Sequence, residues 1–403
     1  MTAHILVVAD GRSQTARSWI RNLQTLGFEV SLISTFLCEP PDVIRNFHVL
    51  PVAFSRLSAQ ENKAGPSAQK QTPNNKHSWV RRFAPFLQFI RYFLGPLSVL
   101  TYRQEFLRLV QDWDPDLVHA LRIPFEGMLG RTTPSSLPFI AATWGNDLTL
   151  HARGSFLMRW FTRRTLKRAD GLTSDTHRDV ALAHQFGFGQ NAPTLVVPGS
   201  GGVDLEGITK AEGFDQDTYA IPDNVYWVVN PRGLRPGSVH QEAFFAAIPE
   251  VLEQQPDTIF ICPGLAQLSQ AHKWAAKYNI ETNLYLLPSL DQSQLWALFK
   301  RSNVFVSPSS HDGTPNTFLE AMACGCFPVA GDIESLRKWI IDGENGLLVD
   351  PTDPEQIANA ILKALTNGDL RDKAAVQNQQ IIKNRASNQA CQEKITEFYQ
   401  QFL

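Results

Sequence analysis

The sequence has little net charge, no long apolar run and no paired cysteine motif. Its 37 basic and 39 acidic residues leave a formal charge of −2, which argues against a nucleic-acid partner. The five cysteines are scattered, without the C-x-x-C spacing or nearby histidines of a zinc site, so we expect reduced thiols and no bound metal. No stretch of about 20 apolar residues and no basic leader is present. We therefore expect a cytoplasmic protein with neither a membrane-spanning helix nor a secretory signal.

The phosphate-binding fingerprint of nicotinamide-dependent oxidoreductases is also missing. That fingerprint, G-x-G-x-x-G, directly follows a first strand. Here the first apolar run, Ile5–Ala9, is followed by Asp10-Gly-Arg-Ser-Gln-Thr, which contains one glycine. This argues against an oxidoreductase.

What is present is enough chain for two or three ordinary globular domains, with 403 residues of which 43% are hydrophobic. The near-neutral total conceals a division. Residues 1–200 carry 22 basic and 14 acidic side chains, whereas residues 201–403 carry 15 and 25. The chain is therefore a basic half followed by an acidic half.

Apolar runs alternate with helical patterns in both halves, which predicts an α/β protein with two doubly wound parallel sheets. The runs are Ile5–Ala9, Val30–Ile33, Leu117–His119, Phe139–Trp144, Leu172–Ser174, Leu195–Val197, Val225–Val229, Ile259–Cys262, Leu284–Leu287, Val304–Val306, Phe327–Ala330 and Leu347–Val349. A glycine cluster at 199–202 marks the linker. We predict domains at 1–205 and 206–385, a mobile insertion at about 56–78, and a final helix over 386–403.

The most informative window follows the predicted strand Val304–Val306. Thr314 and Pro315 are typical N-cap and first-turn residues of a helix. Proline has no N–H, so we expect the amides of Asn316, Thr317 and Phe318 to be free. A helix start at the carboxyl end of a parallel strand is a site for phosphate.

Two acidic residues flank this helix start. Glu320 lies four residues after Asn316, hence on the same helical face, where it could accept hydrogen bonds from a ribose. Asp312 lies in the preceding loop, where it could hold sugar hydroxyls.

The window Asp312-Gly-Thr-Pro-Asn-Thr-Phe-Leu-Glu320-Ala-Met-Ala-Cys-Gly325-Cys-Phe-Pro328-Val329 resembles the E-x7-E segment of retaining nucleotide-sugar glycosyltransferases of family four. Further similar segments are Gly27-Phe-Glu-Val30, Pro115-Asp-Leu-Val-His119, Val197-Pro-Gly-Ser-Gly-Gly-Val-Asp204 and Gly343-Glu-Asn-Gly-Leu-Leu-Val349. The resemblance implies the GT-B architecture. In it, two Rossmann-like domains face a cleft and the C-terminal helix crosses back to the first domain.

The resemblance also implies roles in donor binding. Asp312 stands in the place of the usual glutamate at the sugar hydroxyls, and Glu320 would hold the ribose. The loop and helix start would bind the sugar and diphosphate through Gly313, Thr314, Pro315, Asn316 and the amides of Thr317 and Phe318. No metal is implied.

The family's basic pair, R-x-x-x-x-K, neutralises the leaving diphosphate, because negative charge builds on the departing oxygen. Arg232 matches its first position, but Gly237 stands at the second. Either Arg235 or His240 substitutes for the lysine, or the second charge is missing. The alternative is that Arg232 and Arg235 are solvated turn residues.

In the first domain the resemblance places the acceptor. The loop after the first strand, whose backbone in the family approaches the diphosphate or the acceptor, contains Gly11, which we expect to face the cleft and to take part in donor binding; a plain strand-to-helix turn is the alternative. Trp144-Gly-Asn-Asp147 stands where relatives carry H-G-x-D or W-G-S-D, so a role for that histidine does not transfer. Asp147 or His119 could contact the acceptor, although a lone histidine beside a strand more often lies in the core.

Two segments of the basic half suggest a membrane surface. Residues 83–100 have apolar positions at three- and four-residue steps, which predicts an amphipathic helix. Residues 152–169 contain six basic residues and no acid. Either segment could face anionic lipid headgroups; the alternative is a helix with a solvated charged face.

Together these features predict a retaining hexosyltransferase that uses a UDP- or GDP-type sugar. Its acceptor would be a lipid-linked or cell-surface glycan precursor, and the enzyme a peripheral protein at the inner membrane face. The alternatives are a sugar-nucleotide epimerase or phosphorylase on the same fold, and a non-catalytic protein that binds nucleotide sugars or glycans.

Overall fold

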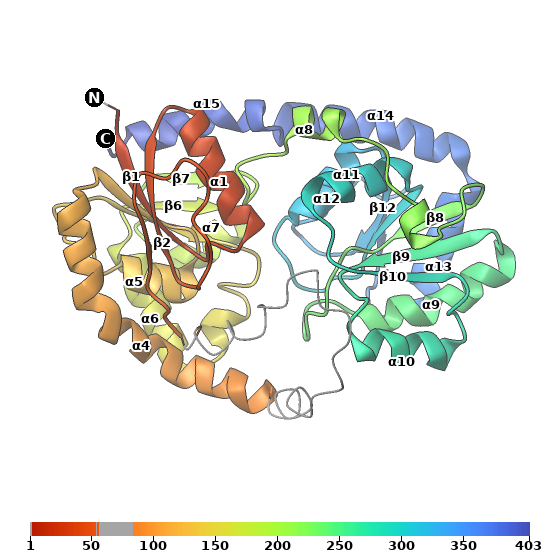
Figure 1. The fold of residues 1–403 in the computed structure, drawn as a ribbon, viewed down its shortest axis with the longest axis horizontal. Coiled ribbons are helices and arrows are strands. Elements are labelled where there is room, and N and C mark those ends of the chain that lie inside the picture. The colour runs from red at the N-terminus through yellow and green to blue at the C-terminus, as the bar shows by residue number, and fades with distance from the viewer. Residues whose placement is uncertain (1, 54, 56–83) are drawn as a thin grey trace. The chain divides into compact units, whose positions relative to one another are not determined.

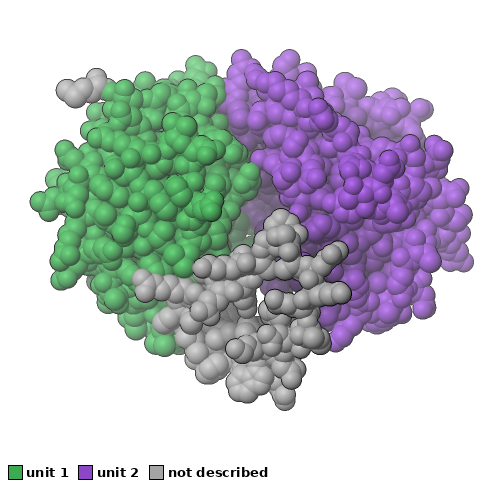
Figure 2. Space-filling model, viewed as in Figure 1, with its two compact units in different colours: residues 1–201, 392–403 green, residues 202–391 purple. Residues whose placement is uncertain are grey.

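The computed structural model describes residues 2–53, 55 and 84–403. The predicted insertion at 56–78 lies outside these described residues. The chain forms two compact units, coloured separately in Figure 2: residues 1–201 with 392–403, and residues 202–391. The sequence-based boundaries lie at 205 and 385, a few residues from these divisions.

Unit 1, comprising residues 1–201 and 392–403, is built on a seven-stranded parallel sheet of order β3-β2-β1-β4-β5-β6-β7. Its strands are β1 (His4–Ala9), β2 (Glu29–Ser34), β3 (Phe47–Val49), β4 (Leu117–Ala120), β5 (Phe139–Thr143), β6 (Gly171–Ser174) and β7 (Thr194–Val196). Its helices of four or more residues before the C-terminus are α1 (Gln14–Thr25), α4 (Ala84–Trp113), α6 (Phe156–Arg168) and α7 (His177–Phe186). The short turns η2 (Ile123–Gly127), α5 (Met128–Gly130) and η3 (His151–Arg153) connect them.

Unit 2, residues 202–391, is built on a six-stranded parallel sheet of order β10-β9-β8-β11-β12-β13 (Figure 1). Its strands are β8 (Tyr226–Val229), β9 (Thr258–Pro263), β10 (Leu284–Leu287), β11 (Val304–Ser307), β12 (Phe327–Gly331) and β13 (Leu347–Val349). Its helices are α8 (Leu205–Lys210), η4 (Asp217–Tyr219), α9 (Gln241–Gln254), α10 (Ser269–Tyr278), α11 (Gln292–Arg301), α12 (Asn316–Ala323), α13 (Pro354–Thr366) and α14 (Gly368–Arg385).

The prediction of two doubly wound α/β sheets is confirmed, because each of the twelve apolar runs coincides with a strand. Every residue of seven of these strands is buried, as expected for parallel strands covered by helices; the seven are β1, β4, β5, β6, β9, β11 and β12. The short edge strand β3 was not predicted. Its three residues are only half-buried, so they lack the continuous apolar character of the central strands.

Helix α4 is longer than predicted and continues through Pro96 to Trp113. The last helix, α15 (Asn388–Gln400), brings its second half into unit 1. There Tyr399 is fully buried, and its hydroxyl lies 3.1 Å from Trp19 Nε1 and 2.6 Å from His119 Nδ1. The hydroxyl of Tyr399 thus joins α15 to α1 and β4, which are far from it in sequence.

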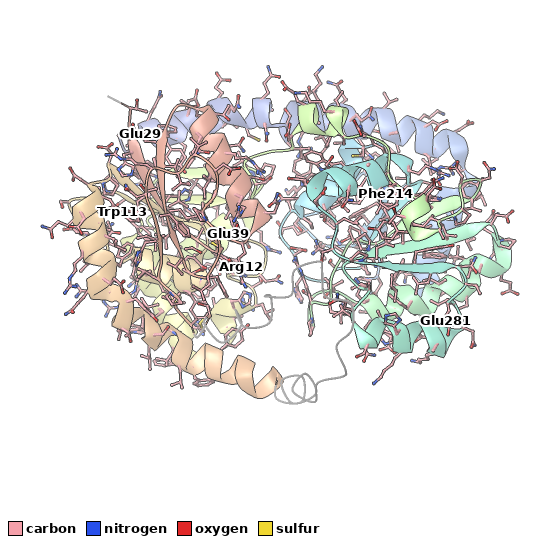
Figure 3. All side chains as sticks on the ribbon, viewed as in Figure 1. Arg12, Glu29, Glu39, Trp113, Phe214 and Glu281 are labelled. Atoms are coloured by element: carbon pink, nitrogen blue, oxygen red, sulfur yellow. The ribbon has the colours of Figure 1, made fainter. Side chains whose placement is uncertain are left out.

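The strand order reverses once in each sheet, between β1 and β4 in unit 1 and between β8 and β11 in unit 2. Ligands of open α/β sheets bind at the carboxyl ends of the strands beside such a reversal. In Figure 3, Arg12, which follows β1, marks this edge of unit 1, whereas Trp113, which precedes β4, lies at the opposite edge. A ligand site is therefore expected at these two carboxyl edges.

Candidate functional site

The loops after β8 and β11 are joined to each other at the strand-order reversal of unit 2. The amide of His240 donates to the carbonyl of Pro308 at 2.8 Å, and the amide of Ser310 donates to that of Ser238 at 2.9 Å. Gly331, at the end of β12, packs so closely that a Cβ would lie 2.0 Å from the carbonyl oxygen of Ser309. The backbone of this edge therefore has little freedom to move.

Arg232 is held inside this loop pair and is only 5% exposed. Its guanidinium Nη2 donates to Oδ2 of Asp312, and its amide donates to Asn230 Oδ1 at 3.0 Å. The side chain of Gln241 donates to its carbonyl. Its Nε is buried with no hydrogen-bond partner among the described residues. Arg232 is therefore a buried, fixed cation, not a solvated turn residue.

Arg235 and His240, the two candidates to replace the missing lysine, differ in their exposure and contacts. Arg235 is exposed, and its charge contributes to the environment of Arg232. Burial lowers the pKa of Arg232, the charge of Asp312 opposes this shift, and that of Arg235 adds to it. His240 Nε2 lies 2.8 Å from the hydroxyl of Ser310. Arg235 is thus the more available second cation.

Helix α12 begins at Asn316 with Pro315 as its N-cap and no side-chain cap. The amide of Phe318 donates to the carbonyl of Pro315 at 3.1 Å, so the expectation that Phe318 is a free donor is wrong. Because Pro315 is in extended backbone at the cap position, its carbonyl points back to close the first turn. Among the described residues, the amide and the buried hydroxyl of Thr317 have no hydrogen-bond partner. Thr317 therefore offers two donors at the helix start.

The loop before α12 leads directly from the Arg232 ion pair to this helix start. Oδ1 of Asp312 accepts from the amide of Gly313 at 2.9 Å, and its carbonyl accepts from the hydroxyl of Ser335 at 3.2 Å. Gly313 and Thr314 are buried. The carboxylate of Asp312 and the open start of α12 thus lie on one fixed loop, and Arg232 reaches Asp312 from the loop after β8.

Glu320 lies one turn into α12 and is 7% exposed. Gln292 at the start of α11 donates from Nε2 to Oε1 of Glu320 at 3.0 Å. Burial raises the pKa of Glu320 to about 7, and the hydrogen bond from Gln292 partly opposes this shift. The carboxyl group therefore keeps its proton to a higher pH than an exposed glutamate does.

Gln292 was not predicted as part of the site. A signal was available in the sequence, because Asp291 and Gln294 form a capping box that fixes the start of α11. These two residues predict a helix start at Asp291. They do not predict that α11 packs on α12, because this contact is visible only in the structure.

In unit 1, Gly11 follows β1 at the carboxyl edge. Its amide donates to Ser34 Oγ at 3.1 Å, and a Cβ at this position would lie 2.5 Å from the sulfur of Cys38. A larger residue would have to displace the side chains of Cys38 and Ser34, so the close approach of the loop after β2 favours glycine here. The packing explains this glycine without reference to a ligand.

The two acceptor-side candidates, Asp147 and His119, lie in different surroundings. Asp147 is 1% exposed, and its carboxylate accepts from Arg122 Nε at 2.8 Å and from the amide of Trp144 at 3.2 Å. His119 lies in the core between the hydroxyls of Tyr399 and Thr173, and burial lowers its pKa to about 3. His119 is therefore a neutral core histidine, and we leave it out of the acceptor site.

Glu126 and Arg122, on the turn after β4, were missed. Glu126 is 5% exposed and accepts from the hydroxyl of Thr35 at 2.6 Å. Burial raises its pKa to about 7, while the bond from Thr35 and the charge of Arg122 oppose the shift. The preceding residue, Phe125, has φ of +68°, a strained conformation of the kind that gathers at functional sites. Their position after the predicted strand Leu117–His119 was the available signal.

Within the described residues, no cluster of three or more His, Cys, Asp or Glu side chains could bind a metal ion. Among the same residues, no helix has the length and hydropathy needed to cross a membrane.

Comparison with known proteins gives matches in both units. The model of glycosyl transferases group 1 matches residues 237–381, and that of the glycosyl transferase 4-like domain matches residues 10–199. An uncharacterized glycosyltransferase of Methanocaldococcus jannaschii is 30% identical over 32% of this chain and 32% of its own. The lipopolysaccharide core biosynthesis glycosyltransferase LpsE of Rhizobium meliloti is 36% identical over 25% and 28%. The chain thus matches about a third of the length of these curated relatives.

The fold extends the likeness to the whole chain. The structure of Anabaena HepE in complex with UDP and glucose has a TM-score of 0.71 and 14% identity, and the match covers 99% of this chain and 100% of that one. Two Rossmann-like units of this kind are the GT-B fold. With a glycosyl transferase family match in each unit, the chain belongs to the group 1 glycosyltransferase family and has the GT-B fold.

Proposed function

We propose that the protein transfers a hexosyl unit from a nucleoside diphosphate sugar to an acceptor hydroxyl with retention of anomeric configuration. The observation that carries the proposal is the buried Arg232, fixed beside the open start of α12. A cation and the free amide of Thr317 at a helix start are complementary to a diphosphate. Unit 2 would therefore bind the donor.

Each part of this edge would take one part of the donor. The guanidinium groups of Arg232 and Arg235, with the amide of Thr317, would bind the diphosphate. Glu320 would accept hydrogen bonds from the ribose. Asp312, with Gly313 and Thr314, would bind the hydroxyls of the hexose. Asp312 becomes available for this once the diphosphate also binds the Arg232 guanidinium, which now pairs with Asp312.

In the reaction, the bond between the anomeric carbon and the diphosphate oxygen breaks, and a bond to the acceptor oxygen forms on the same face. The electron pair of the broken bond goes to the diphosphate, where Arg232 stabilises the developing charge. The acceptor's proton passes to that phosphate oxygen. No carboxylate serves as a nucleophile in this scheme, which follows the mechanism that the resemblance implies.

For the donor we propose a UDP- or GDP-type sugar. HepE, which shares the fold, is named in complex with UDP and glucose, and this supports UDP as the first donor to test.

We place the acceptor on unit 1, at the carboxyl edge around Gly11, Trp144 and Asp147. Asp147 would act through Arg122, whose guanidinium it orients and whose side chain is 38% exposed. The acceptor would be a lipid-linked or cell-surface glycan precursor, used at the cytoplasmic face of a membrane.

Hydrolysis of UDP-, GDP- and ADP-sugars tests the proposal, with the anomer of the released sugar followed by NMR. We expect one donor class to be hydrolysed with retention, and Arg232→Ala and Glu320→Ala to lose this activity. Arg301→Gln is the matched control, because Arg301 is a half-buried arginine of unit 2 paired with Asp223. Turnover only with phosphate or to an epimer would support the alternative enzymes; binding without turnover would support a non-catalytic protein.

A further inference from the structure

Arg131, which follows α5, and Arg164 of α6 both lie against the ring of Trp160, and Arg103 of α4 is close enough for its charge to act on Arg131. The guanidinium carbon of Arg131 lies 4.9 Å from the ring centre of Phe161, and that of Arg164 lies 5.0 Å from that of Trp160. Burial, then the charges of Arg164 and Arg103, lower the pKa of Arg131. We call Arg103, Arg131 and Arg164 the arginine cluster.

The positive charge of the cluster is not compensated within the described residues. None of its three arginines forms an ion pair with a described carboxylate. The Nε of Arg131 is buried and has no hydrogen-bond partner among the same residues. Like charges brought together without a counter-ion are unfavourable unless an anion joins them. The arrangement therefore points to an anionic ligand.

Large apolar side chains are exposed on the same two helices. Leu94, Leu97 and Leu100 of α4 are 48%, 41% and 52% exposed, and Phe156 and Trp160 of α6 are 77% and 40% exposed. These five residues form what we call the apolar ridge. The helices are fixed to each other, since the hydroxyl of Ser155 donates to the carbonyl of Tyr92 at 2.7 Å.

Trp160 belongs to the ridge and also contacts Arg164 of the cluster, so the two features form one continuous surface. Arg153, Arg159 and Arg163 are also exposed on or beside α6. Exposed apolar side chains flanked by arginines and an amphipathic tryptophan match the boundary between lipid headgroups and acyl chains. A protein partner would need matching acids, whereas a bilayer supplies phosphates at any position.

We propose that the arginine cluster binds the phosphate groups of anionic phospholipids while the apolar ridge inserts among the headgroups. Arginine binds phosphate through two parallel N–H···O hydrogen bonds, which accounts for three arginines and no lysine at this position. The surface lies on unit 1, on helices that carry none of the proposed donor contacts. Docking is therefore separable from sugar transfer, although it would bring the proposed acceptor unit to a membrane.

Flotation with phosphatidylcholine vesicles, with and without phosphatidylglycerol, tests this proposal at low salt. We expect wild-type protein to bind the anionic vesicles. The triple variant Arg103→Gln, Arg131→Gln, Arg164→Gln should lose on the order of 100-fold in partition coefficient, because each basic residue near an anionic surface adds roughly fivefold. The matched control is Lys363→Gln, Lys373→Gln, Lys383→Gln, which removes the same charge from exposed positions of unit 2 and should bind as wild type.

Two further variants keep the test independent of folding. Arg103→Gln with Arg164→Gln changes exposed residues only and should lose about 25-fold by the same estimate. Leu94→Ser, Leu97→Ser and Phe156→Ser should weaken binding while retaining its dependence on phosphatidylglycerol. Thermal unfolding and UDP-sugar hydrolysis report separately on the fold and on unit 2.

The proposal is overturned if wild-type protein stays off anionic vesicles, or if the triple variant binds them as wild type does. Titration with inorganic phosphate distinguishes a lipid-binding surface from a site for a soluble phosphate compound. Phosphate binding that the triple variant loses, with no vesicle binding by wild type, would identify a site for a soluble phosphate compound. Vesicle binding by a protein that hydrolyses no donor would leave docking intact and remove the proposed function.

Discussion

The carboxylate of Asp312 forms an ion pair with Arg232, eighty positions earlier in the chain, and both side chains are largely buried. The pair joins the loop after β8 to the loop after β11. It also means that the cation proposed to bind the donor already has a negative partner. A diphosphate must share or replace that partner, so the pair couples donor binding to the position of Asp312.

The first prediction concerns Arg232. Replacing it with glutamine removes the fixed cation, and we expect donor turnover to fall by roughly 10²–10³-fold, as when one charge-stabilising donor is removed from an active site. Steady-state hydrolysis of the active UDP- or GDP-sugar checks this. Arg301→Gln should stay near wild type, and an equal loss in both variants would contradict a specific role.

Removing the other partner tests stability. Asp312→Asn leaves Arg232 buried without a counter-charge, and breaking a buried pair in this way costs about 3–5 kcal/mol. We expect a lower thermal unfolding temperature, partly restored by UDP because the diphosphate supplies the missing charge. Asp223→Asn, which breaks the more exposed pair with Arg301, is the control and should change little. No rescue by UDP would argue against a diphosphate at Arg232.

The next prediction uses the pKa of Glu320, which burial raises to about 7 from 4.5. The folded state holds this proton more tightly than the unfolded state, so its stabilising contribution is complete below pH 4.5 and is lost as the pH rises through about 7. In Glu320→Gln the fall in unfolding temperature between pH 5 and 8 should be smaller than in wild type. Glu344→Gln, at an exposed position, is the control and should show the wild-type slope.

Donor binding should depend on the same proton. Ribose hydroxyls donate best to the ionised carboxylate, which lowers its pKa on binding. UDP-glucose affinity should therefore rise from pH 6 to 8, with release of a proton that calorimetry in buffers of different ionisation enthalpy detects. Glu320→Gln should bind UDP-glucose without this pH dependence. Identical profiles for the two proteins would remove Glu320 from the ribose site.

Another prediction concerns the core of unit 1. Tyr399→Phe removes the hydroxyl that Trp19 and His119 contact, which leaves buried polar atoms unpaired and should cost about 1–3 kcal/mol. Thermal unfolding measures the loss. Tyr285→Phe, at a half-buried tyrosine of unit 2, should have a smaller effect, and hydrolysis by folded Tyr399→Phe should be unchanged.

The sequence predicted the parts of the fold that depend on continuous burial. Twelve of the thirteen strands in the described residues were visible because each contains a run of apolar residues, whereas the edge strand β3 was missed because Phe47, His48 and Val49 are only half-buried. The helix start at Pro315 was predicted to within one residue. The hydrogen bond that occupies the amide of Phe318 depends on the backbone conformation of Pro315, which the sequence does not specify.

The candidate site was predicted where its residues are close in sequence. Asp312 to Glu320 form one window. The partners that fix their chemistry, Arg232 for Asp312 and Gln292 for Glu320, come from other loops, and only the packing of β8 on β11 and of α11 on α12 shows them. His119 failed as an acceptor contact for the same reason, since its partner Tyr399 is 280 positions away.

The structure of the protein with UDP tests the central claim most directly, because it locates the diphosphate. The account predicts that the diphosphate oxygens lie within hydrogen-bond distance of the Arg232 guanidinium and the Thr317 amide, with the ribose hydroxyls on Glu320. A diphosphate bound elsewhere, with Arg232 still paired only to Asp312, would contradict it.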